Sequence, residues 1–142
     1  MFKKFIMTEM TGEIIINGPN KDFESIKEID ESGVEFWTAR NLFSLLGYAT
    51  WQTFDEVVVR AAKAALNSGQ IVRNHFSQLT KMVDIGSGSK RAVKDWKLDR
   101  YACYLVAQNG DPKIPQIAIA QTYFAVQTRR QEVFDKLPEA EK

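Results

Sequence analysis

The most distinctive chemistry in this sequence is a run of basic side chains between residues 86 and 101. It begins with a GSGS segment and carries a surplus of about three positive charges. Flexible cations of this kind can follow a phosphate backbone, because they displace the counterions condensed on it. Trp96 lies between two of the lysines, where its ring could either stack on a base or pack in the core. The basic residues of the run are Lys90, Arg91, Lys94, Lys97 and Arg100.

Two other groups of residues resemble functional motifs but lack the required pattern. The segment GSGSK has neither the glycine spacing nor the Ser or Thr after lysine that a Walker phosphate loop needs, so a flexible hairpin tip is the simpler interpretation. His75 and Cys103 could be drawn as a base and a nucleophile, but no third group orients the base, and Cys103 lies in an apolar helical pattern. We therefore expect no enzymatic activity, no metal and no cofactor.

Composition limits the class of protein further. The length of 142 residues suits one domain. The charges nearly balance, with nineteen Lys and Arg residues and eighteen Asp and Glu residues, so any basic surface must be local. A single cysteine fits a cytoplasmic location. No apolar run reaches the length of about 18 residues that a membrane helix needs, so we expect no membrane association.

The basic run needs a scaffold, and the pattern around it predicts an antiparallel hairpin. We expect one strand only over 81–85, a turn at SGS, and a returning strand over 90–98. Asp99 should then cap a helix over 100–108, which ends at NGDP. The residues expected to contact nucleic acid are Lys81, Lys90, Arg91, Lys94, Trp96 and Lys97.

The first half of the chain predicts mainly helices. A short helix over 23–29, a strand over 34–38 and a helix from the N-cap Thr38 to Gly47 are expected in turn. A capping box of Thr53 and Glu56 should start the next helix after a linker. These two helices could also form a DNA-binding helix-turn-helix motif. Acidic residues in the first turn of the second helix would then face the DNA phosphates, so we predict that the pair packs in the core instead.

The last predicted helix, over 115–134, is apolar nearly all the way round. Such a helix is buried on two sides, either in the core or in a homodimer. Together these elements predict an α+β fold, mainly helical with a small antiparallel sheet. We expect a flexible leader over 1–20, one domain over 21–135, and a polar tail over 136–142 that begins a linker to a missing C-terminal region.

Five segments within residues 22–134 form a recognisable set: FWTARNLFSLLGY, NSG, HF, IGSGSKRAVKDWKLDRYACYLVAQNGDP and AQTYFAVQTRRQE. Together they closely resemble the bacterial DNA-damage-inducible protein D family. A looser likeness links the chain to the N-terminal domain of BRO proteins and phage antirepressors. It rests on Trp37, Ala39, Leu42, Leu46, Gly47 and Tyr48.

The resemblance implies a non-enzymatic protein of the SOS-type damage response that acts in recombination or repair regulation. BRO-type domains are regarded as DNA-binding, which favours single- or double-stranded DNA as the partner. The resemblance also implies a strand-exchange recombinase filament as a partner. The alternative is an interaction module without DNA contact, which binds that filament or dimerises through the 115–134 helix.

Overall fold

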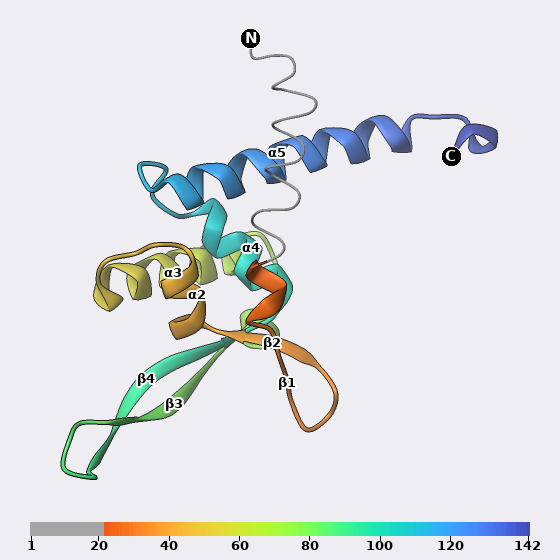
Figure 1. The fold of residues 1–142 in the computed structure, drawn as a ribbon. Coiled ribbons are helices and arrows are strands. Elements are labelled where there is room, and N and C mark those ends of the chain that lie inside the picture. The colour runs from red at the N-terminus through yellow and green to blue at the C-terminus, as the bar shows by residue number, and fades with distance from the viewer. Residues whose placement is uncertain (1–21) are drawn as a thin grey trace.

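The computed structural model describes residues 22–142 as an α+β domain with one long hairpin (Figure 1). A helical turn over 22–25 comes first. The strands are β1 (Glu28–Ile29), β2 (Glu35–Thr38), β3 (Phe76–Asp84) and β4 (Lys90–Leu98). The helices are α2 (Ala39–Leu45), α3 (Trp51–Asn67), α4 (Arg100–Gln108) and α5 (Pro115–Asp135), with 3₁₀ turns η2 (Val72–Asn74) and η3 (Glu139–Glu141). The predicted fold class is confirmed, and the predicted leader over 1–20 lies outside the described residues.

The sheet is antiparallel throughout, in the order β1-β2-β4-β3. β2 pairs with β4 only at Trp37↔Leu98 and Thr38↔Lys97, whereas β3 and β4 pair over nine residues. Most of the β3–β4 hairpin therefore has no further strand beside it. Figure 1 shows it extending away from the helices as a two-stranded ribbon. Residues 80–94, the outer part of this hairpin, are called the arm below.

The helix signals around residues 38–67 are largely confirmed. Thr38 caps α2 by accepting a hydrogen bond from the Asn41 backbone N–H, and Gly47 follows the helix with a φ of +82°. The predicted capping box is wrong, because α3 starts one turn earlier. Thr50 caps it and accepts from the Thr53 backbone N–H, so the expected linker is shorter. The predicted inner face is buried: Phe54, Val57, Val58, Ala61 and Ala65.

Two boundaries near the sheet are also wrong. The helix expected over 23–29 is only the turn over 22–25, because residues 28 and 29 instead form β1 against β2. β3 starts at Phe76 rather than residue 81, since its first residues pair with the end of β4. In both places the hydrogen bonds of a neighbouring strand override the local preference.

The core lies where α2, α3, α4, the first turn of α5 and the inner ends of β2 and β4 meet. Its largest fully buried apolar side chains are Trp37, Leu42, Phe54, Val58, Leu98, Val106 and Ile117. Asp99 caps α4 as predicted, accepting from the Ala102 backbone N–H. None of the helices within residues 22–142 is long and apolar enough to span a bilayer.

Helix α5 departs from its predicted burial. Only Ile117 and Ala120 are buried, although the sequence is apolar nearly all round. Figure 1 shows the reason: α5 crosses the end of α4 and then runs past the body of the domain. Burial on two sides by the core is therefore wrong for the second half of α5, where Val133 and Phe134 are each 45% exposed.

Candidate nucleic-acid interface

The register of the hairpin sorts the side chains of the arm onto two faces. Directly opposed residues in an antiparallel pair share a face, and successive residues alternate. The pairs Lys81↔Val93 and Val83↔Arg91 therefore lie on one face. The pairs Thr80↔Lys94, Met82↔Ala92 and Asp84↔Lys90 lie on the other. The sequence-predicted cations are thus divided between opposite sides of the ribbon.

The first of these faces carries the accessible charge, and we call it the cationic face. Lys81 and Arg91 are both exposed, and neither forms an ion pair within residues 22–142. Their direct opposites, Val93 and Val83, are half-buried apolar residues. Two unpaired cations on a projecting ribbon are free to exchange counterions with a phosphate backbone.

The second face is electrostatically compensated, and we call it the paired face. Lys90 Nζ lies 2.6 Å from Asp84 Oδ1, directly across the ladder. Lys94 Nζ lies 3.2 Å from Asp55 Oδ2 in α3. Exposed ion pairs contribute little to stability, but each one supplies a carboxylate that competes with phosphate for the lysine. The structure therefore separates Lys90 and Lys94 from Lys81 and Arg91.

The remaining two predicted contact residues lie at the base of the hairpin. The Trp96 side chain is 7% exposed, and its Nε1 donates to Asp55 Oδ1 at 2.7 Å. Of the two interpretations of this ring, core packing is the one that the geometry supports. Lys97 donates to Asp30 Oδ2 at 3.0 Å and lies over the Phe36 ring, so its charge is held within the domain.

Arg100, counted in the basic run, binds the acidic segment near the N-terminal end of the described chain. It donates to Glu24 and to Glu35, with closest distances of 2.6 and 2.9 Å. These hydrogen bonds raise the guanidinium pKa and lower the pKa values of both carboxyl groups. The acidic segment is therefore an intramolecular partner for this arginine, and Arg100 does not contribute to the exposed charge of the arm.

Arg40 and Asp95, both outside the predicted set, join the base of the arm to α2. Arg40 in α2 donates from its guanidinium to the Lys94 carbonyl at 2.9 Å and stacks over Trp51 at 3.9 Å. The fully buried Asp95 accepts from the backbone N–H groups of Arg40 and Trp96. Its Oδ2 has no hydrogen-bond partner within the described residues. No local sequence signal marks these contacts, because Arg40 and Asp95 are 55 residues apart.

His75 and Cys103, the pair considered for catalysis, have separate environments. His75 Nδ1 lies 2.5 Å from Asp99 Oδ2, and its ring packs against Tyr101. Cys103 is 3% exposed, and burial raises the pKa of its thiol well above the usual value. A thiol held in its protonated form is a poor nucleophile.

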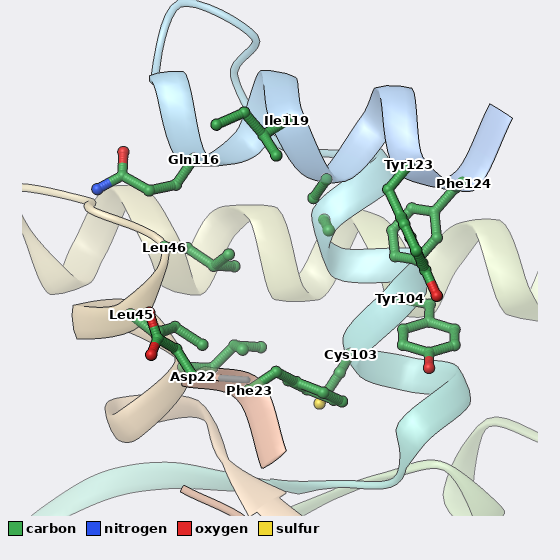
Figure 2. Close-up of a pocket in the computed structure, with 13 residues that line it drawn as sticks. Asp22, Phe23, Leu45, Leu46, Cys103, Tyr104, Gln116, Ile119, Tyr123 and Phe124 are labelled. Carbon is green, nitrogen blue, oxygen red and sulfur yellow. The ribbon is translucent and has the colours of Figure 1, made fainter. Parts of the chain in front are cut away.

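An apolar pocket of about 230 Å³ lies between α2, α4 and α5, with Phe23 at one side. Figure 2 shows Leu45, Tyr104 and Ile119 around it, one from each helix. Figure 1 places α5, which forms one wall of this pocket, on the side of the domain away from the arm. The chain therefore carries a charged ribbon and an apolar hollow as two distinct surfaces.

An α+β domain with a projecting basic β-arm is the class that this geometry defines. Residues 25–126 match the N-terminal domain of the BRO family, so the chain belongs to that family. The chain is also 53% identical over 120 residues to the DNA damage-inducible protein D of Escherichia coli strain K12. That match covers 84% of this chain but only 44% of the relative, and no solved structure matches significantly. The family resemblance seen in the sequence is confirmed.

Proposed function

We propose that this chain is a non-enzymatic DNA-binding module of a bacterial DNA-damage response that acts in recombination or repair regulation. The role in a damage response is inferred from the similarity to the Escherichia coli DNA damage-inducible protein D. The observation that carries the DNA contact is the pair of exposed cations, Lys81 and Arg91, on one face of the arm. Both lack a carboxylate partner within the described residues, so phosphate binding breaks no existing ion pair.

The proposed contact is electrostatic and independent of base sequence. Lysine and arginine contacts to phosphate fix the position of a protein on DNA but carry no sequence information. Lys90 and Lys94 are assigned a weaker role, because Asp84 and Asp55 already bind them. Trp96 and Lys97 are assigned to the fold of the hairpin base.

The test is fluorescence anisotropy with labelled single- and double-stranded DNA, starting at low salt. We expect binding that weakens steeply as salt rises. The double variant Lys81→Ala/Arg91→Ala should reduce the salt slope by about two units, since each phosphate contact contributes about 0.9. The matched control is Lys63→Ala/Lys113→Ala, which removes two exposed cations outside the arm. Equal loss in both double variants would reject the arm as the interface.

A second candidate function is supported by the apolar pocket and by the exposed second half of α5. In this alternative the chain is a protein-interaction module that binds a strand-exchange recombinase filament or a second copy through the 115–134 helix. Pockets of this apolar character bury apolar side chains of a partner. No DNA binding at low salt, together with sedimentation of the chain with recombinase filaments or as a dimer, would favour this alternative.

A further inference from the structure

The tip of the arm exposes aliphatic side chains beside its cations. Ile85 is 57% exposed and directly follows the last ladder residue of β3. By alternation it continues the cationic face, two residues beyond Val83. Its backbone N–H donates to the Ser89 carbonyl, which closes the tip. The three residues at the turn, Gly86, Ser87 and Gly88, all have positive φ and small side chains, so the tip is narrow.

The character of this face differs from that of a base-reading surface. Recognition of bases in the major groove requires donors and acceptors. Apart from Lys81 and Arg91, which we propose bind phosphates, the ladder positions of the cationic face between 79 and 93 carry only aliphatic side chains. The arm also presents no aromatic side chain for stacking on single-stranded bases, since Trp96 is buried at its base. Exposed aliphatic residues flanked by cations instead match the wedges that unstack base pairs from the minor groove.

The dimensions of the ribbon set a condition on minor-groove binding, since the wider major groove admits a two-stranded ribbon without distortion. Paired strands lie about 4.8 Å apart before their side chains are counted. The minor groove of B-form DNA is about 6 Å wide, so a two-stranded ribbon enters it only if the groove is widened. Insertion of an apolar side chain between base pairs bends the duplex toward the major groove and opens the minor groove. A narrow tip that ends in a branched aliphatic residue provides such a wedge.

We propose that the arm enters the minor groove of duplex DNA and inserts Ile85 between base pairs as an apolar wedge. Lys81 and Arg91 then bind the phosphates that flank the kinked step. This inference rests on the proposed DNA-binding function and adds to it a duplex substrate, a bent product and a residue that produces the bend. The preferred ligand is duplex DNA that contains an easily unstacked step, such as a pyrimidine–purine step or a mismatch.

The test measures bending and binding separately, with fluorescent dyes at the two ends of a short duplex. The full chain should raise energy transfer between the dyes. Ile85→Ala should abolish that rise and weaken binding to a fully paired duplex about tenfold, while leaving the salt slope unchanged. A duplex with a mismatch at its centre should recover part of this affinity, because less stacking is lost. Thermal melting checks that each variant is folded.

Met82→Ala is the matched control, because Met82 is 56% exposed but lies on the paired face. It should bend DNA as the parent does. If the parent binds duplex DNA without bending it, or if Ile85→Ala and Met82→Ala behave alike, the wedge is refuted while the proposed function stands. If the parent binds no DNA at low salt, the proposed function itself fails. A stronger affinity for single strands than for duplex would also overturn the wedge.

Discussion

The Asp55 carboxylate in α3 accepts a hydrogen bond of 2.7 Å from the indole Nε1 of Trp96 in β4. The same carboxylate holds the Lys94 ammonium through its other oxygen. One acidic side chain in the first turns of a helix therefore anchors the base of the hairpin and neutralises a cation of the arm. The hydrogen bond to Asp55 also explains why the Trp96 ring has a structural role at the base of the hairpin.

Replacing Trp96 with phenylalanine separates a structural role from a DNA-stacking role. Trp96→Phe removes the indole N–H and leaves the Asp55 carboxylate without this donor. We expect the free energy of unfolding to fall by about 1–3 kcal/mol, as for other hydrogen bonds to charged groups. DNA affinity of the folded variant should be unchanged. Urea unfolding and anisotropy measure the two effects. A stable variant with weakened DNA binding would restore the stacking interpretation.

Neutralising Asp84 should strengthen DNA binding. The Asp84 side chain is 76% exposed, and its carboxylate holds Lys90 near the tip. Asp84→Asn releases that lysine and removes a negative charge, so we expect tighter binding and a salt slope steeper by about 0.9, equivalent to one phosphate contact. The control Glu132→Gln breaks an exposed pair with Arg129 on α5 instead. Unchanged affinity for Asp84→Asn would show that the tip of the arm stays away from the phosphates.

Gly47 should be required for stability because of its backbone conformation. Its φ of +82° is left-handed, which costs an L-residue with a Cβ about 1–2 kcal/mol. A Cβ at this position would also meet the Gln116 amide at 3.0 Å, although this exposed side chain can move aside. Gly33→Ala, at the same φ but in open space, is the control and should lose a similar amount. Gly47→Asn should lose less than Gly47→Ala, since asparagine tolerates this region. Full stability of Gly47→Ala in urea would contradict the assignment.

Acid should remove the contribution of the Arg100 cluster. The pKa values of Glu24 and Glu35 lie below their ordinary value of 4.5 because Arg100 donates hydrogen bonds to both carboxylates. The stabilisation is therefore fully present above about pH 4.5 and is lost as pH falls through the lower folded-state values. Arg100→Met should lower the melting temperature by several degrees at pH 7, and the difference from the parent should narrow toward pH 3. The Arg100 guanidinium also lies 5.0 Å from the centre of the Trp37 ring. A difference that stays constant across melts at pH 7, 5, 4 and 3 would assign the effect to this packing.

The sequence was informative where the signal is local. Thr38 and Asp99 were identified as helix caps because each precedes an apolar helical pattern. The returning strand at Lys90 and the α+β class followed from turn chemistry and periodicity. These signals depend on residues within one or two turns of each other, so a single sequence contains them.

Strand register and ion pairs between residues far apart in the chain could not be predicted from the sequence. The start of β3 at Phe76 is set by its pairing with Leu98, and the pairs Lys94–Asp55 and Lys97–Asp30 join elements 39 and 67 residues apart. Counting charges along the chain placed all these lysines in one basic run. Only the register and the long-range ion pairs show that Lys81 and Arg91 differ from the rest.

Successive residues of the arm point to opposite faces. Odd and even changes in the length of a strand therefore have different effects on which side chains share a face. Adding or deleting one residue in β3 between the base and the tip would exchange the faces beyond that point, whereas a change of two would preserve them. Relatives with longer or shorter arms can therefore keep the cationic face only if the strands differ by even numbers. Alignments of such hairpins should be made in steps of two residues, counted outward from the Phe76↔Leu98 pair.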